Sequence, residues 1–142
     1  MGFQMALTSG WLGTRATKEV LAKHGINDYF KTVLTLDDYI FRKFNGKIPV
    51  RQTHAPFRRS TKKKAWLITE SLKELGVKSS DAIFVGDSPE DMLAGKRLGT
   101  KTVAVLTGWG GRYKRRFKEI KPDKIIASTA NLPEVVGRLE TA

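Results

Sequence analysis

The sequence predicts an α/β fold with three layers, in which a parallel sheet carries helices on both faces. Short apolar runs recur along the chain without in–out alternation, which is typical of strands buried on both faces. The segments between these runs repeat apolar residues at helical spacing, and alternating strands and helices indicate a parallel sheet. The predicted strands are residues 5–7, 33–36, 82–85, 102–106 and 124–127.

The predicted helices follow the strands in turn. The first covers residues 17–25 and places Val20, Leu21 and His24 on one side. The second covers residues 65–76, where apolar residues recur at helical spacing before a glycine, a common helix stop. The same pattern predicts two more helices, at residues 89–99 and 132–139.

Residues 39–61 interrupt this alternation, because they are far longer than an ordinary connection between a strand and a helix. With Asn45-Gly46 as the turn, Tyr39–Phe44 and Lys47–Thr53 would form a hairpin. A disordered basic loop fits the same residues, and the sequence does not decide between the two. We therefore expect one core domain over residues 1–142 with a basic insertion at about 39–61.

The composition is that of a globular protein with a single core. The chain has 142 residues, of which 40% are hydrophobic and 28% charged. It contains no cysteine, which excludes a disulfide framework, and no apolar run of the roughly 20 residues that a membrane span requires. The residues after Met1 lack the pattern of a secretory signal, so a cytoplasmic location is expected.

The net charge of +12 comes from 26 Lys and Arg against 14 Asp and Glu. Such an excess suggests an anionic partner: nucleic acid, a phosphorylated metabolite, or only a solvated basic surface. The cations gather in two clusters, over residues 39–64 and 112–118. Aromatic residues lie among the first cluster and would stack on bases in a nucleic-acid complex, although they equally suit the covering of apolar surface.

The stretch VGDSPEDM at 85–92 carries the strongest chemical signal. Ser88 suits a helix N-cap, Pro89 suits the first helical position, and Asp91 completes a capping box. Asp87 instead ends an apolar strand, where a carboxylate contributes little to packing. A hard divalent cation such as Mg²⁺ prefers oxygen ligands of this kind. The sequence thus predicts a helix cap, a cation site, or both.

Four stretches together resemble the haloacid dehalogenase-like (HAD) hydrolases, and most closely their phosphoglycolate-phosphatase-like members. AIFVGDSPEDMLAGKRLGTKTVAVLTGWG at 82–110 resembles the family's fourth motif and following strand, and GFQMALTSG at 2–10 its second motif. VLAKHGINDYFKTVLTLDD at 20–38 and PDKIIASTANLPEVV at 122–136 resemble the flanking strands and helices. The resemblance implies a Rossmann-like sheet and a Mg²⁺-dependent phosphomonoester hydrolase that acts on a small phosphorylated metabolite.

The resemblance also implies roles for individual residues. Asp87 and Asp91 would hold Mg²⁺, and Thr8, Ser9 and Gly10 would bind the phosphoryl group. A lysine ahead of the 65–76 helix would offset the charge of that group. One family spacing selects Lys62 and the other selects Lys64, and the proline that would decide between them is absent.

The family's chemistry begins with an Asp-x-Asp motif, whose first Asp attacks phosphorus and whose second is the general acid and base. No such motif occurs in the sequence, and the neighbouring acids Asp37 and Asp38 are adjacent and follow a different strand. Three explanations are open: a piece of a longer enzyme, which we favour, a noncatalytic relative that kept the cation site, or a partner chain that supplies the strand.

The strand that carries this motif would lie in the centre of the sheet, between the strands at 5–7 and 82–85. Without it, those two strands either pair directly or keep unpaired backbone groups, so we expect marginal stability or self-association. The alternative function is a noncatalytic basic module on a HAD-like scaffold, which binds nucleic acid or another anionic partner.

Overall fold

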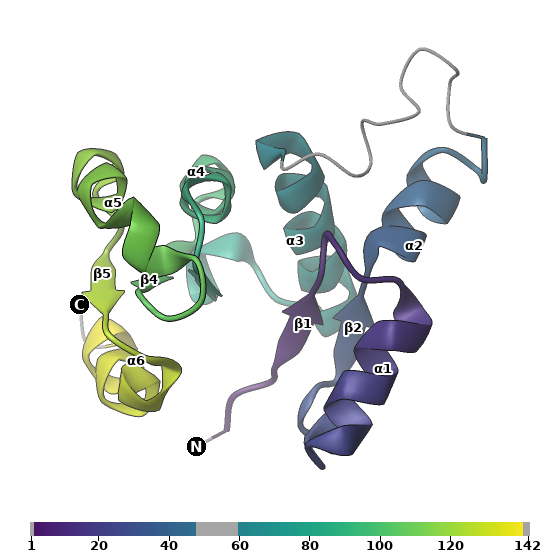
Figure 1. The fold of residues 1–142 in the computed structure, drawn as a ribbon, viewed down its shortest axis with the longest axis horizontal. Helices are drawn as coiled ribbons and strands as arrows, with labels where there is room; N and C mark the ends of the chain where they lie inside the picture. The colour runs from purple at the N-terminus through teal and green to yellow at the C-terminus, as the bar shows by residue number, and fades with distance from the viewer. Residues whose placement is uncertain (1, 48–59, 141–142) are drawn as a thin grey trace. The chain divides into compact units, whose positions relative to one another are not determined.

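The computed structural model describes residues 2–47 and 60–140. The chain consists of two compact units, Met1–Val77 and Lys78–Ala142, and each is described by itself (Figure 1). That both belong to a single core domain remains a prediction. Every predicted strand has an observed counterpart, displaced by one or two residues at its ends.

The N-terminal unit, Met1–Val77, is built on two parallel strands. β1 (Ala6–Thr8) pairs with β2 (Thr32–Leu34) in a register that sets Leu7 beside Val33. Helix α1 (Thr14–Lys23) connects the two strands, as the apolar spacing predicts. The strands are parallel because this crossover returns the chain to the same edge of the sheet before β2 begins.

Helix α3 (Thr61–Leu75) packs against β1 and β2. It begins at the N-cap Ser60 and ends at Gly76, which adopts the left-handed conformation of a helix stop. The core of this unit consists of Leu34, Leu36, Tyr39 and Leu67. At 15 residues, α3 falls short of a membrane span, and no other helix in the described ranges reaches the necessary length and apolarity.

The 39–61 insertion begins as a helix. α2 (Leu36–Asp38) continues into a π-helix, η2 (Tyr39–Lys43), so the hairpin predicted for Tyr39–Phe44 is wrong for that arm. The reason is packing: Tyr39 enters the core and contacts Trp66 edge to face, with ring centroids 5.5 Å apart. The other arm, Lys47–Thr53, lies almost wholly outside the described residues.

The C-terminal unit, Lys78–Ala142, holds a parallel sheet in the order β3-β4-β5. These strands are Ile83–Gly86, Lys101–Val105 and Lys124–Ile126. On one face, α4 (Pro89–Leu98) and α5 (Lys114–Ile120) contact each other over Met92, Ala104 and Phe117. On the other, α6 (Leu132–Glu140) packs against β4 and β5 (Figure 1). This unit therefore has the predicted three layers.

Short 3-10 helices complete the connections, at Asn27–Tyr29, Ser79–Asp81, Gly110–Tyr113 and Thr129–Asn131. Within the described ranges, β1 has β2 as its only strand partner and β3 has only β4. The two outcomes expected for a sheet without its central strand, direct pairing of β1 with β3 or unpaired edges, both stay predictions. Among the described residues of its own unit, each of these strands is therefore paired along one edge.

Candidate functional site

The turn after β1 brings the three residues of the predicted phosphate-binding stretch to the end of the strand. The backbone N–H of Ser9 donates to the carbonyl of Leu34 at 2.9 Å, which extends the β1–β2 pairing by one bond. The Ser9 hydroxyl accepts the N–H of Leu12 at 3.1 Å and closes the turn. Gly10, on the far side of the turn, is buried, while Thr8, at the end of β1, is half-buried. Thr8, Ser9 and Gly10 thus lie at the carboxyl end of a parallel strand, where such folds bind ligands.

Lys63 extends from the first turn of α3 to this stretch. Its ammonium group donates to the carbonyl of Gly10 at 2.9 Å, and only 1% of the residue is exposed. Gly10 allows this approach, because a Cβ there would lie 3.2 Å from Lys63 Cε. Burial, and secondarily the charge of Lys64, lower the pKa of Lys63 from 10.5 to about 8. A buried cation therefore lies beside the predicted phosphate-binding turn.

The two lysines that the sequence singles out lie differently. Lys62 is exposed, and Lys64 is half-buried, with its Cε 3.6 Å from the position of a Cβ on Gly10. The roles of Lys62 and Lys64 remain predictions. Sequence reasoning missed Lys63, although helical spacing offered a signal. Lys63 lies four residues before the core residue Leu67 and therefore on the same face of the helix.

The depressed pKa of Lys63 has a consequence for stability. Between about pH 8 and 10.5 the unfolded chain keeps this proton while the folded chain releases it, so the free energy of unfolding rises with pH across that window. The difference between a pKa of 10.5 and one of about 8 corresponds to a rise of roughly 3 kcal/mol from this residue. Lys63→Met keeps the apolar stem and removes the charge, so it should abolish this residue's contribution to the rise. The measurement is the free energy of unfolding from urea unfolding at the two ends of the pH window.

Lys62→Met is the matched control, because it removes an exposed charge from the same helical turn and leaves the buried Lys63 in place. Its pH dependence should match that of the unmodified chain. A Lys63→Met variant whose unfolding midpoint still climbs as steeply as that of the unmodified chain would contradict the assignment.

In the C-terminal unit, Asp91 makes the predicted helix cap. The Ser88 hydroxyl accepts the N–H of Asp91, and Asp91 Oδ2 accepts the N–H groups of Ser88 and Asp87, each at 3.2 Å. Asp91 is only 4% exposed. The capping box is therefore confirmed, and the Asp91 carboxylate also holds the backbone of the loop that presents Asp87.

Asp87 connects the ends of β3 and β4. Its Oδ2 accepts the backbone N–H of Trp109 at 3.2 Å, across 22 positions of sequence. Gly108, at φ 63°, permits this contact, because a Cβ at that position would lie 2.8 Å from the same oxygen. The hydrogen bond fixes the direction of the Asp87 carboxylate, and because the residue is only half-buried, the carboxylate still reaches the surface.

The donor set of this loop suits Mg²⁺ in kind but not in number. Carboxylate oxygens are the ligands this hard ion prefers, and it usually keeps several waters and takes others from substrate phosphate. The described residues hold no group of three or more His, Cys, Asp or Glu placed to bind a metal. Asp87 and Asp91 would therefore need water, phosphate or a further carboxylate to complete an octahedral shell.

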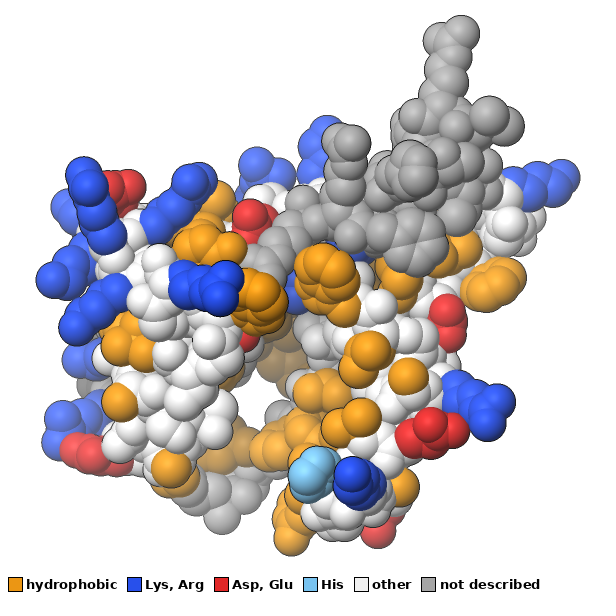
Figure 2. Space-filling model, viewed as in Figure 1, with side chains coloured by type: hydrophobic (Ala, Val, Ile, Leu, Met, Phe, Trp, Pro, Cys, Tyr) orange, Lys and Arg blue, Asp and Glu red, His pale blue; other side chains and the backbone are white. Residues whose placement is uncertain are grey.

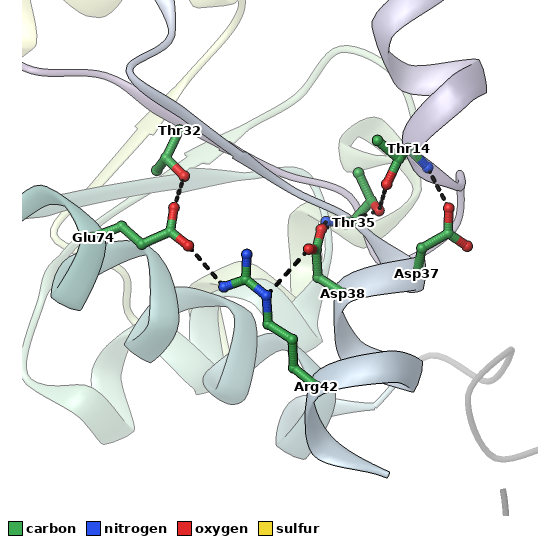
Figure 3. Close-up of polar contacts among 7 residues, drawn as sticks. All are labelled: Thr14, Thr32, Thr35, Asp37, Asp38, Arg42 and Glu74. Carbon is green, nitrogen blue, oxygen red and sulfur yellow. Dashed lines mark hydrogen bonds and ion pairs between the residues drawn. The ribbon is translucent and has the colours of Figure 1, made fainter. Parts of the chain in front are cut away.

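The neighbouring acids Asp37 and Asp38 serve the N-terminal unit itself (Figure 3). Asp37 Oδ2 accepts the N–H of Thr14 at 2.6 Å and so caps α1 from a distant part of the chain. Asp38 Oδ2 accepts the N–H of Thr35 at 2.8 Å and caps α2. Both carboxylates thus have structural partners, which agrees with their exclusion as an Asp-x-Asp motif.

An ion-pair network anchors the start of the insertion to α3 (Figure 3). Arg42 of η2 pairs with Asp38 at 3.3 Å and with Glu74 at 2.7 Å, and Glu74 also accepts the hydroxyl of Thr32. The Thr32 hydroxyl and then Arg42 lower the pKa of Glu74, and the hydrogen bond with Glu74 raises the pKa of Arg42. The network therefore joins β2, η2 and α3.

Comparison with known proteins places residues 60–132 within a family model described as HAD-hydrolase-like. Pyrophosphatase PpaX of Halalkalibacterium halodurans is 26% identical over 96% of this chain and 53% of its own length. A phosphoglycolate phosphatase of Vibrio parahaemolyticus is 30% identical over 96% of this chain and 50% of its own. The chain thus spans about half the length of the curated relatives it matches.

Solved structures share the fold. The crystal structure of a predicted phosphatase from Clostridium acetobutylicum aligns with a TM-score of 0.70 and 20% identity, over 96% of this chain and 53% of that one. A haloacid dehalogenase-like family protein of Streptococcus pneumoniae aligns at 0.68 and 19% identity, over 94% and 52%. These similarities confirm the α/β fold class with parallel strands flanked by helices.

Proposed function

Because the chain belongs to the HAD-hydrolase-like family, we propose that it is part of the core of a Mg²⁺-dependent phosphomonoester hydrolase. The observation that carries this proposal is the Asp87 carboxylate, which the N–H of Trp109 holds at the carboxyl end of β3. The relatives named above, a pyrophosphatase and a phosphoglycolate phosphatase, support a small phosphorylated metabolite as the substrate class.

Within this proposal, the N-terminal unit binds the phosphoryl group. The Thr8 hydroxyl and the Ser9-Gly10 turn offer hydrogen-bond partners for its oxygens, and Lys63 supplies a positive charge from within the fold. Because Lys63 has a pKa of about 8, it is mostly protonated at neutral pH and loses that charge in alkaline solution. Lys64, which approaches the same turn, would add to the positive potential.

The C-terminal unit binds the metal ion. Asp87 would hold the ion, and Asp91, which accepts the N–H groups of Asp87 and Ser88, would brace the loop and add negative charge beside it. When bound, Mg²⁺ neutralises charge on the phosphoryl oxygens as it develops in the transition state. Asp87 contributes negative charge that would retain the ion. The hydrogen bond from the Trp109 N–H orients the Asp87 carboxylate before substrate binds.

The sequence contains no Asp-x-Asp, so the proposal places the nucleophile outside these 142 residues. We propose that an apolar strand ending in Asp-x-Asp completes the protein and adds to the free edge of β1 or β3. The first Asp would attack phosphorus and expel the alcohol, which takes a proton from the second, and water would then release phosphate from the aspartyl-phosphate.

Turnover of p-nitrophenyl phosphate tests the proposal. The 142-residue chain alone should show none, because it lacks the nucleophile. The longest in-frame product of the gene should carry Asp-x-Asp upstream of Met1, turn over with Mg²⁺ and lose activity in EDTA. A longest product that lacks the motif, or that is inactive across a wide pH range and several divalent metals, would overturn it.

A further inference from the structure

The helical layer formed by α4 and α5 carries a strong excess of positive charge. From Met92 to Lys121 the sequence holds nine Lys and Arg, and Glu119 is its only acid. Eight of these cations are exposed on or beside the two helices, and we call them the basic face. They are Lys96, Arg97, Arg112, Lys114, Arg115, Arg116, Lys118 and Lys121. Figure 2 shows Lys and Arg side chains gathered over this part of the C-terminal unit.

Few of these charges are compensated within the protein. Arg115 and Glu119 approach to 3.6 Å, but both are highly exposed, so the pair contributes little. Lys96 donates to the carbonyl of Lys121 at 2.6 Å, which leaves its charge in place. For the remaining members of the face, no carboxylate among the described residues lies within ion-pair distance. The face is therefore a concentrated positive surface and not a network of salt bridges.

The charges of α5 oppose its own stability. Its first turn contains no acid and begins with Lys114, Arg115 and Arg116, at the helix end where the dipole favours negative charge. Lys114 and Lys118 are also four residues apart, a spacing at which like charges repel. Folding alone would favour acids in the first turn of α5. The Lys and Arg found there instead point to an anion outside the protein that offsets their repulsion.

An aromatic side chain borders the face. Trp109 is 48% exposed, and the guanidinium of Arg112 lies 4.5 Å from the centre of its ring. The Trp109 backbone is held by Asp87, so the ring extends from a fixed point. Exposed aromatic rings and Arg planes are the surfaces on which unpaired bases stack.

The apolar side of α5 is used inside the unit. Phe117 is fully buried, and Ile120 and Tyr113 pack around the same cluster. The helix consequently has no apolar face with which to enter a lipid surface, whereas interfacial helices need one. The observations favour a soluble, elongated polyanion that offers both repeated phosphates and flat rings.

We propose that the basic face binds single-stranded nucleic acid, with its Lys and Arg contacting phosphates and the Arg112–Trp109 pair stacking on a base. This proposal does not rest on the proposed phosphatase activity, although the two adjoin at Trp109, whose backbone N–H contacts Asp87 and whose ring borders the basic face. A single small phosphorylated substrate would need few of these cations, whereas phosphates repeated along a strand engage many.

Fluorescence anisotropy of a labelled oligothymidylate of about 16 nucleotides, with the 142-residue chain, tests the proposal. Five phosphate contacts predict a slope of log K against log salt near −3.5, and about a hundredfold loss of affinity between roughly 50 and 200 mM salt. The triple variant Lys114→Gln/Arg115→Gln/Arg116→Gln should make this slope shallower by about 2. Trp109→Leu should weaken binding about tenfold without changing the slope.

Matched controls separate a local surface from overall charge. Lys18→Gln/Lys23→Gln/Lys31→Gln removes the same number of exposed charges from the N-terminal unit, and Tyr29→Leu removes an exposed aromatic side chain there. Both should bind as the unmodified chain does. Equal losses in the two triple variants would overturn the proposal, as would stronger binding to vesicles of equal parts phosphatidylcholine and phosphatidylglycerol than to the oligonucleotide.

The α5 triple variant should remain folded, because it removes cations from the end of the helix that disfavours them. Circular dichroism and urea unfolding verify this before binding is compared. If this variant unfolds, the salt dependence of the unmodified chain still tests the proposal. A slope of log K against log salt shallower than about −1 corresponds to fewer than two phosphate contacts and would overturn the proposal.

Discussion

Asp87→Asn is expected to lower kcat/KM for p-nitrophenyl phosphate by about a thousandfold in a gene product that carries Asp-x-Asp. The substitution removes the charge that retains Mg²⁺, and loss of the metal's stabilisation of the transition state amounts to several kcal/mol. The Asn side chain keeps an oxygen that accepts the N–H of Trp109, so the contact between β3 and β4 should persist. The expected defect is in metal binding and catalysis, while the fold is retained.

The measurement is turnover against Mg²⁺ concentration, with urea unfolding recorded on the same samples. Asp81→Asn is the matched control, since Asp81 is an exposed acid in the short helix before β3 and should leave both turnover and stability unchanged. Near-normal turnover of Asp87→Asn at any Mg²⁺ concentration would show that Asp87 is not a metal ligand. A parallel loss of stability would instead assign it a structural role between the strands.

Local signals in the sequence predicted most of the elements. Ser88, Pro89 and Asp91 specify the start of α4 through bonds among residues at most three apart, and Gly76 and Gly99 end two helices in left-handed conformations. Such features need no knowledge of the rest of the fold. For the same reason the continuous apolar runs predicted each strand to within one or two residues.

Two helical segments escaped prediction because their stabilisation comes from tertiary contacts. In α5 the sequence KRRFKEI offers only Phe117 and Ile120 as apolar residues, and Phe117 is buried by α4 and β4, not by neighbours in sequence. In the π-helix, Tyr39 enters a core shared with Trp66 of α3. A short segment has too little periodicity to reveal either contact.

The candidate site was predictable in its residue types and less so in its assignments. Thr8, Gly10 and Asp87 are recognisable because each lies at or just after the carboxyl end of a strand. The partners of Asp87 and Lys63 lie 22 and 53 positions away, so only the folded chain identifies them. Lys63 was overlooked because a lysine on the buried side of a helix contradicts the usual pattern, and such exceptions tend to occur at functional positions.

Gly110→Ala is expected to destabilise the C-terminal unit by about 3 kcal/mol or more, the largest effect of any single methyl group in the described chain. A Cβ at Gly110 would lie 1.7 Å from the carbonyl oxygen of Val105, and backbone atoms cannot rotate away as a side chain can. The 3-10 helix that begins there would have to move off β4. That shift would pull Trp109 from Asp87 and loosen the packing of Phe117.

Two further glycines make this prediction specific. At Gly111 the obstacle is the carbonyl oxygen of Leu106 at 3.2 Å, so Gly111→Ala should cost much less. At Gly137, inside α6, a Cβ meets nothing within 4 Å, and Gly137→Ala should stabilise by about 0.5–1 kcal/mol because alanine favours the helix. Urea unfolding should therefore rank the variants in the order Gly137→Ala, unmodified, Gly111→Ala, Gly110→Ala. If Gly110→Ala unfolds at the same urea concentration as the unmodified chain, the close approach of this loop to β4 is wrong, and with it the route by which Trp109 reaches Asp87.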